Sequence, residues 1–483
     1  MKQLIQLTFL LIVLAVMALP AQAQWQCAYA TYDDDVNGTG HNTPSVAVIS
    51  EDTFIALVMS PDVRNFMIPY VDADSAVGRV YTYGYGGETA DVYELWSDQS
   101  FDQVLMKNAA KIVATSDGTI YVANNDDNHN ILVFKFASDT IDSFSPYYRE
   151  ATGSNSIFGI AVDENGYVYV CNDTTSGPTD DIKIYPPIAQ WTTGRNDAPA
   201  QTVDLPDGHY LGITTTPDGS AIFVCDSTNR KILKYVGSPA SGYAADPSFD
   251  FQLSPDDTST TGTVLPVPIN LAYMPANNIL FAAVDVHGYT SGTRSYEYGR
   301  IYLINPFTGD LADADSSISV IDVAQWNYDL TGSYSNRAGG TDPGNASGYT
   351  STYDVALDAN GNLYSQSHFG WTVEKWVYSG TLPVITSVQQ VSPEAPEGYH
   401  LFQNYPNPFN PVTNITYAVP ARGFVELRVY DLLGRLVTTL VSADQAAGTY
   451  TVRYDASSLS SGTYVYTIHS GDFTATRTFT LIK

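Results

Sequence analysis

The chain has 483 residues, of which 44% are hydrophobic and 15% charged, so it is too long for one ordinary domain and too apolar for a disordered chain. Its 51 acidic residues outnumber 22 Lys and Arg, and the formal net charge of -29 disfavours a nucleic-acid partner or an anionic membrane surface. The 35 Tyr and 36 Gly indicate an all-β fold and exclude an all-helical one.

Residues 1–23 have the features of a secretory signal peptide. Lys2 precedes an apolar run from Phe9 to Leu19, and the small-residue cleavage site Ala21-Gln22-Ala23 follows. We expect the mature chain to begin near Gln24. The apolar run is shorter than the roughly 20 residues that span a bilayer, and no later segment approaches that length, so we expect no transmembrane segment in the mature chain.

The three cysteines, Cys27, Cys171 and Cys225, are too few for a disulfide framework, and we expect the last two to be unpaired, buried strand residues. A lipoprotein anchored at Cys27 is a minor alternative, because the large side chains of Trp25 and Gln26 precede it. No Cys-x-x-Cys pair and no His pair at helical spacing indicates a zinc site.

An acidic run places Asp33, Asp35 and Asn37 at alternate positions before Gly38, as a calcium loop does. These three residues are the candidate metal ligands. Pro44 stands at the twelfth position, where a calcium-binding helix–loop–helix would supply a Glu, so we favour an isolated acidic turn and leave bound Ca2+ open.

A repeated unit runs through residues 24–382. Each copy is an alternating strand, a polar turn of Asp, Asn and Gly, and a second strand rich in Val, Ile, Tyr and Phe; the turns fall at residues 52, 118, 166, 219, 278 and 361. This periodicity predicts a β-propeller in which each repeat is one blade. We favour six blades, and the Tyr-rich inserts at 289–298 and 328–349 leave a seventh open. The N-terminal strand from Trp25 is expected to complete the last blade beside Thr372.

Two segments of the repeats resemble the NHL family of six-bladed propellers. Asp126-Asp127-Asn128-His129-Asn130-Ile131 is similar to the Asn-His element of that family, and Asp226-Ser227-Thr228-Asn229-Arg230-Lys231-Ile232 is similar to its basic variant. The resemblance covers the propeller alone.

Four histidines, His129, His209, His287 and His368, fall in the repeats, and His209 directly precedes the inner strand of its blade. A general base or metal ligand near the channel mouth is one hypothesis for His209. A hydrogen-bonded loop histidine is the interpretation that we favour.

Residues 383–398 are predicted to be a proline-bearing linker, and residues 399–483 a separate module with a net charge of +1. Six short alternating strands in this module predict a small Ig-like β-sandwich.

Three motifs of the module resemble the C-terminal sorting domain of type IX secretion cargo. They are Asn404-Tyr405-Pro406-Asn407-Pro408-Phe409-Asn410-Pro411, then Val429-Tyr430-Asp431-Leu432-Leu433-Gly434-Arg435, then Ser461-Gly462-Thr463-Tyr464. The resemblance implies passage through the periplasm, recognition by the type IX translocon as a partner, and release or display at the cell surface.

Local catalytic motifs, such as Gly-x-Ser-x-Gly, His-Glu-x-x-His or a phosphate-binding lysine loop, are absent from the sequence. We therefore favour a secreted propeller that binds an unknown ligand or protein. An extracellular lactonase-like hydrolase or lyase, with a metal or histidine in the channel, is the alternative, because propeller active sites leave no local motif. Converging Asp, Asn, Glu or His side chains at the channel mouth would favour the enzyme, and an apolar or Tyr-lined mouth would favour binding.

Overall fold

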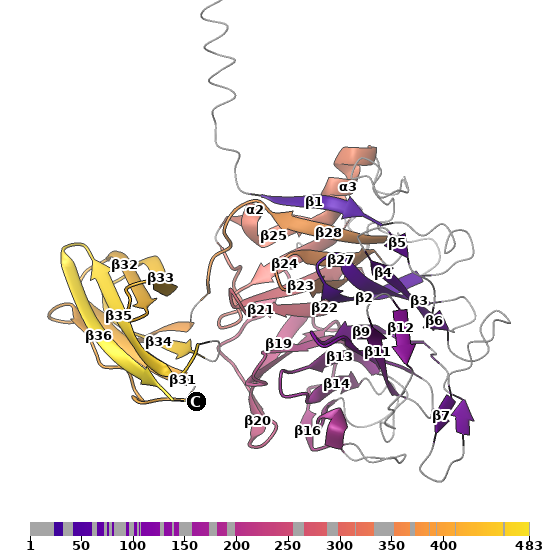
Figure 1. The fold of residues 1–483 in the computed structure, drawn as a ribbon. Coiled ribbons are helices and arrows are strands. Elements are labelled where there is room, and N and C mark those ends of the chain that lie inside the picture. Colours follow the sequence, from indigo (N-terminus) through magenta and orange to yellow (C-terminus); the bar gives the residue numbers. More distant parts are fainter. Residues whose placement is uncertain are drawn as a thin grey trace, which may run out of the picture.

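The computed structural model describes residues 24–31, 42–59, 65–71, 75–76, 80–81, 93–95, 101–103, 106, 108–125, 130–137, 140–143, 157–172, 181–190, 199–254, 265–286, 298–313, 315–332, 352–367, 372–385, 387–392, 394–410, 412–456 and 459–482 (Figure 1). The helices in these ranges are η2 (Ile188–Gln190), α2 (Ser316–Ser319) and α3 (Val323–Thr331). Within them, no helix has the length and apolar character that crossing a bilayer requires.

Antiparallel sheets of four or five strands make up the N-terminal three quarters of the described chain. The first three are β2 (Asn42–Ser50), β3 (Thr53–Met59), β4 (Asn65–Val71), β5 (Ser75–Ala76) and β6 (Val80–Tyr81); β9 (Lys111–Ala114), β10 (Thr119–Ala123), β11 (Ile131–Ala137) and β12 (Thr140–Ser143); and β13 (Ile157–Val162), β14 (Val168–Asn172), β15 (Asp181–Tyr185) and β16 (Gln201–Asp204). The next three are β17 (Tyr210–Thr215), β18 (Ala221–Asp226), β19 (Lys231–Ser238), β20 (Gly242–Ala245) and β21 (Phe251–Gln252); β22 (Val267–Met274), β23 (Ile279–Asp285), β24 (Gly299–Ile304) and β25 (Val320–Asp322); and β26 (Thr352–Leu357), β27 (Leu363–Ser367), β28 (Thr372–Tyr378) and β1 (Trp25–Ala30). A two-stranded sheet, β7 (Tyr93–Leu95) and β8 (Phe101–Gln103), lies between the first two in sequence.

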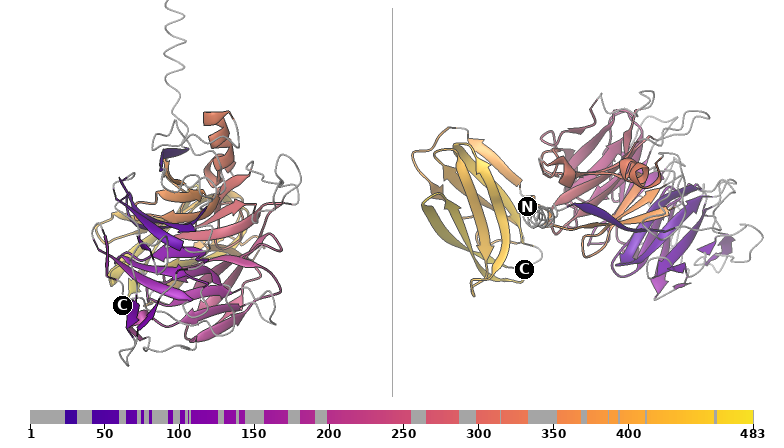
Figure 2. Two further views of the ribbon diagram at one scale, coloured as in Figure 1. Left: turned by 90° about the vertical axis from the view of Figure 1, so that its right-hand side faces the viewer. Right: turned by 90° about the horizontal axis from the view of Figure 1, so that it is seen from above.

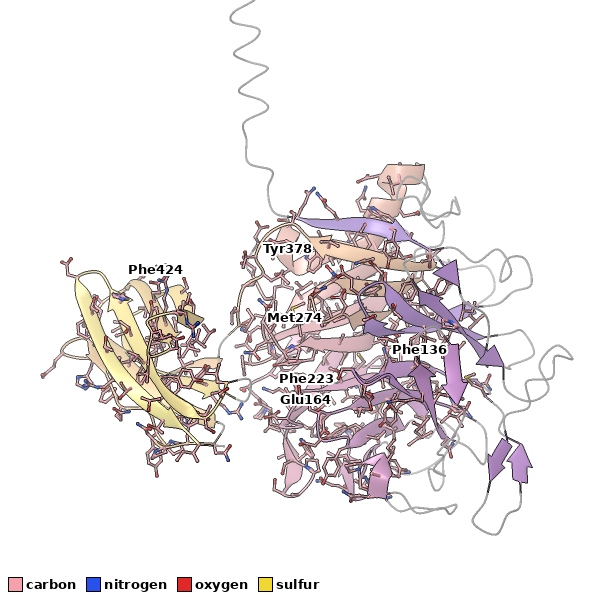
Figure 3. The ribbon with its side chains drawn as sticks, in the orientation of Figure 1. Phe136, Glu164, Phe223, Met274, Tyr378 and Phe424 are labelled. Carbon is pink, nitrogen blue, oxygen red and sulfur yellow. The ribbon has the colours of Figure 1, made fainter. Side chains whose placement is uncertain are left out.

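The inner strands of these sheets form a closed ring, which makes the domain a β-propeller. β2 lies beside β9, then β13, β17, β22 and β26 follow in order, and β26 lies beside β2 again. Buried apolar side chains fill the space between each pair of neighbouring sheets; for example, Phe223 of β18 packs against Tyr273 of β22 (Figure 3). The favoured number of six blades stays a prediction, which this ring of inner strands supports.

The predicted turns between the first and second strands all adopt a left-handed backbone. Asp52 and Asn278 have φ values of 58° and 52° there, and Gly118, Gly166, Gly219 and Gly361 have φ between 68° and 82°. Such φ values strain most side chains, which explains the choice of Gly, Asn and Asp at these positions. In four of these turns an Asp carboxylate accepts from a backbone amide; for example, Asp117 accepts from Thr119 and Asp218 from Ser220, both at 3.0 Å.

The N-terminal strand closes the ring, as the sequence predicts. β1 pairs antiparallel with β28, the strand that ends at the labelled Tyr378 (Figure 3). Thr31 continues the pairing, because its amide donates to the Val373 carbonyl at 2.9 Å. The indole Nε1 of Trp25 donates to the Ile318 carbonyl at 3.0 Å, so β1 is also anchored to the neighbouring blade.

The C-terminal module is a β-sandwich with its own core. One sheet has the order β29 (Ser387–Ser392), β34 (Gly448–Asp455), β31 (Val412–Val419), β30 (His400–Leu401); the other has β33 (Leu436–Gln445), β32 (Gly423–Tyr430), β35 (Gly462–Ser470), β36 (Phe473–Leu481). All six predicted strands are present. The buried cluster between the sheets, which includes Tyr417, Leu427 and Phe479, consists of residues of this module alone, and the module stands beside the propeller in the view from above (Figure 2).

The segment expected to be a linker, residues 383–398, is largely structured. Ser387–Ser392 form the edge strand β29, which pairs with β34 of the sandwich. Just before it, the backbone amide of Ile385 donates to the Asn277 carbonyl of the propeller at 2.8 Å. The side-chain amide of Asn278 donates to the Ile385 carbonyl at 3.0 Å. The prolines flank the strand and do not interrupt it, which is why composition alone suggests a linker.

Candidate functional site

An apolar layer lies at the face where the inner strands of four neighbouring blades begin. It consists of Phe158, Leu211, Ile269 and Tyr353, one residue from each of these strands, with Val267 packed against it. Each of these strands carries a register shift at this level. Leu211 and Ile269 are both 3% exposed, whereas Phe158 is half-buried.

His209 lies at this face, as its place before an inner strand predicts. Its imidazole meets the ring of Phe158 edge-on, with 5.2 Å between the centroids, and is half-buried. Its carbonyl accepts from the Ser227 amide at 2.9 Å and from the Ser227 hydroxyl at 2.8 Å. These backbone bonds hold the loop before β17 against the loop after β18, and both interpretations of the His209 imidazole stay predictions.

The other predicted ligands and histidines cannot be placed. Asp33, Asp35, Asn37, His129, His287 and His368 lie outside the described residues, as does the signal segment 1–23. In the part of the chain that the structure describes, no three His, Cys, Asp or Glu side chains come close enough together to hold a metal ion.

A buried ion pair that the sequence analysis missed lies next to the apolar layer, because Asp354 directly follows Tyr353. Lys111 of β9 is 3% exposed and its ammonium donates to the carboxylate of Asp354 on β26, which is 0% exposed. The same carboxylate accepts from the Ser45 hydroxyl, from the Val46 amide at 3.0 Å and from the Val355 amide at 2.8 Å. Four donors from three blades therefore bind the Asp354 carboxylate. We call Ser45, Lys111 and Asp354 the clasp, because they connect the first two blades to the last one.

Two glycines let neighbouring inner strands approach closely. A Cβ on Gly212 would lie 2.4 Å from the Ile269 carbonyl oxygen, and one on Gly159 would lie 3.0 Å from the Ile213 amide nitrogen. Asn270 donates its side-chain amide to the Tyr353 carbonyl of the following blade at 2.9 Å. Inner strands of neighbouring blades are therefore in close contact at this level.

The cysteines are buried between blades. Cys171 and Cys225 form no disulfide and are fully buried, in the packing layers on either side of the fourth sheet. Cys27 is the third residue of β1, where its thiol donates to the Tyr29 carbonyl at 3.2 Å. Burial raises the pKa of the Cys27 thiol, so it stays protonated.

A cavity of about 820 Å³ lies between the propeller turns and the sandwich. Propeller residues Asp218 and Phe223 line one side, and Thr451 and Arg453 of β34 line the other. Because both domains form its walls, the cavity exists only while the sandwich is joined to the propeller.

In the tail, Asn404 and Phe409 are the buried residues of the first sorting motif, and its other described residues, Tyr405 to Pro408 and Asn410, are exposed. Asn404 is buried and its side-chain amide donates to the Pro406 carbonyl at 3.0 Å and to the Thr413 hydroxyl at 2.9 Å. Phe409 packs edge-on against Phe479, and its backbone pairs with β36 through Thr480. Tyr405 is 81% exposed by contrast, and Pro411 lies outside the described residues.

The remaining motif residues sit at turns and strand starts. Gly434 has a φ of 79° in the turn between β32 and β33, where a left-handed backbone is needed. Gly462 begins β35, and the ring of Tyr464 stacks on Phe479. Folding therefore explains the residue types of Gly434 and Tyr464, whereas a Cβ on Gly462 would make only ordinary contacts.

The chain is thus an all-β protein in which a β-propeller precedes a C-terminal β-sandwich. The family model described as the secretion system C-terminal sorting domain matches residues 403–482, and the sandwich is such a sorting domain. This match confirms the resemblance that its three motifs indicate.

Solved structures similar to the chain cover mainly its propeller. A protein of unknown function from Bacteroides thetaiotaomicron is 11% identical over 74% of this chain and 76% of that chain, with a TM-score of 0.40. A luciferin-regenerating enzyme is 12% identical over 75% and 98%, with a TM-score of 0.38. Regucalcin, a calcium-binding protein from Agrobacterium tumefaciens, is 10% identical over 68% and 89%, with a TM-score of 0.37. No curated protein matches the chain, and nothing about activity follows from identities this low.

Proposed function

We propose that this chain is a type IX secretion cargo, addressed by its sandwich, whose propeller binds a ligand or protein outside the cell. The single observation that supports the sorting role is the sorting-domain match at residues 403–482, which lies in a module with its own hydrophobic core. The signal peptide would be removed during export to the periplasm, and the translocon would then release the protein or display it on the cell surface.

We favour binding over catalysis for the propeller because the described side chains at its mouth form an apolar layer. Asp354, a buried carboxylate that follows Tyr353 of this layer, already accepts from Lys111 and three further donors. A divalent cation there would have to displace the lysine. A ligand site would therefore be built on the apolar layer, beside His209.

The test is removal of the tail from the chain in a host with the type IX system. The cut is placed after residue 386, because β29 pairs with β34 of the sandwich and residues 382–385 hydrogen-bond to the propeller. The chain that ends at residue 386 should fold but accumulate in the periplasm, because each domain has its own core. Normal levels of this truncated chain outside the cell would refute the sorting role.

Calcium binding at Asp33, Asp35 and Asn37 stays a prediction, with the acidic turn favoured. Melting of the full chain with added CaCl2 or with EDTA tests it, and D33N/D35N is the matched variant. An increase in Tm with calcium that D33N/D35N abolishes would establish the site. Equal Tm values for both chains in both conditions would support the acidic turn.

A further inference from the structure

The hairpin between β32 and β33 presents an apolar tip that folding does not explain. Leu432 and Leu433 are 69% and 79% exposed in the full chain, and Leu436 just beyond them is 54% exposed. Adjacent leucines at such exposure are costly in water and gain nothing from the core of their own domain. They remain exposed with the propeller present, so the propeller is not their partner.

The tip is held rigidly by the residue that precedes it. The Asp431 carboxylate accepts from the Leu433 amide and the Arg435 amide, each at 2.9 Å, and from the Arg435 guanidinium at 2.6 Å. The Gly434 amide closes the turn by donating to the Asp431 carbonyl at 3.0 Å. A preorganised apolar tip loses little conformational freedom when it binds, which favours affinity.

The base of the tip is reinforced from both strands. β32 and β33 shift register at Leu427/Arg428 and again at Val429/Tyr430, which increases the local twist and directs the hairpin end. Hydrogen bonds from the Arg435 amide and side chain also lower the pKa of Asp431, because they favour the ionised carboxylate.

Charge selects the kind of partner. Arg435 lies beside the leucines with 76% of its side chain accessible; its Nε binds Asp431, and its two terminal amino groups can still donate to a partner. Residues 399–483 have a net charge of +1 on a chain whose total is -29. A partner with an apolar pocket and an acidic rim would match both features, whereas the strongly acidic propeller would repel such a rim.

We propose that the leucine tip, Leu432 and Leu433 with Arg435 beside them, is the anchor by which the tail docks into an apolar, acid-rimmed pocket of the export translocon. This inference rests on the proposed sorting function and names the surface that would perform it. Buried aliphatic anchors at the centre of an interface commonly supply most of its binding energy.

The test compares export of full-length variants in the type IX host. The double variant L432S/L433S should reduce the amount outside the cell at least about tenfold, because it removes two buried anchors of the contact. The control F424S lies at the opposite end of the same strand, where Phe424 is 53% exposed (Figure 3), and should be exported normally. The conservative variant L432M/L433M should also be exported, since it keeps the tip apolar.

The outcomes separate this inference from the sorting function. Resistance of the purified variants to limited proteolysis shows that the tail is folded, because the substituted side chains lie outside the core. Normal export of folded L432S/L433S, with the tail-less chain still trapped, would overturn the docking tip alone. Normal export of the tail-less chain would overturn the sorting function itself. Equal loss in F424S, or loss of self-association or vesicle binding in L432S/L433S, would assign the leucines to another role and reject the translocon contact.

Discussion

At the scale of single residues, the buried pair of Lys111 and Asp354 is the feature that most strongly joins the two ends of the ring. It connects β9 and β26, which are 243 residues apart in sequence. Breaking a buried pair leaves one uncompensated charge, whereas an exposed pair contributes little. We therefore expect a large difference between two lysines of the same blade.

Lys111→Met should lower the free energy of unfolding by about 3 to 5 kcal/mol, because Asp354 would lose its ammonium partner while buried. The control is Lys135→Met, which removes the exposed pair with Asp117 and should cost about 1 kcal/mol or less. Urea unfolding followed by Trp fluorescence measures both, since all six Trp residues lie in the propeller. Equal losses in the two variants would contradict the clasp.

Glu374 gives the propeller a pH dependence of definite sign. Burial raises the pKa of this carboxyl above its ordinary value of 4.5, although the Ser365 and Thr372 hydroxyls donate to it at 2.7 and 2.6 Å. Between the ordinary and the raised pKa, the folded chain holds a proton that the unfolded chain has lost. Stability from this group is therefore complete below pH 4.5 and falls as the pH rises through the raised pKa.

Glu374→Gln should flatten this dependence and stabilise the propeller at pH 7, because the folded chain would no longer have to ionise a buried carboxyl. The amide can still bond to both hydroxyls. Trp-monitored urea unfolding at pH 5 and pH 7 tests the change, with the exposed Glu164→Gln as control. A variant less stable than the parent at pH 7 would show that Glu374 is ionised and stabilising.

At the scale of elements, β1 decides whether the last blade has an unpaired edge. Trp25 contacts Tyr378, with 5.2 Å between ring centroids, and Phe281 at 6.2 Å, so one side chain joins two blades. Gln26 lies on the same strand but is exposed.

Trp25→Ala should destabilise the propeller by about 2 to 3 kcal/mol, somewhat less than the loss of a fully buried Trp, and Gln26→Ala should stay within about 0.5 kcal/mol. Urea midpoints of the two variants provide the comparison. Similar midpoints for both would mean that β1 contributes backbone pairing alone.

The sequence predicts elements well where a local rule fixes them. Asp52 and Asn278 mark turns because their residue types tolerate positive φ, and the missing fourth strand of the last blade predicts β1. The edge strand β29 escapes prediction because its partner β34 is about 60 residues away and its own sequence alternates weakly.

The candidate site is predicted less completely because its contacts are long-range. The place of His209 at the mouth follows from its position before an inner strand. The clasp of Ser45, Lys111 and Asp354 does not, because its members are assembled by ring closure, and no spacing in the sequence relates them. Likewise, the sorting motif shows that Leu432 and Leu433 occur together, while only the fold shows that they are exposed.

At the scale of the whole molecule, the distribution of charge and the two sets of hydrophobic cores both separate the propeller from the sandwich. The acidic excess belongs to the propeller, and the sandwich is close to neutral with a core made of its own residues. A module built in this way should act independently of the domain that precedes it.

The most direct measurement of this account is the location of an unrelated periplasmic protein fused to residues 386–483 in a type IX host. We expect this fusion to reach the cell surface or the medium. A fusion to residues 399–483 lacks β29 and should be exported less well, because the β34 edge is left unpaired. A folded 386–483 fusion that stays in the periplasm would contradict the assignment of the sandwich as a transferable address.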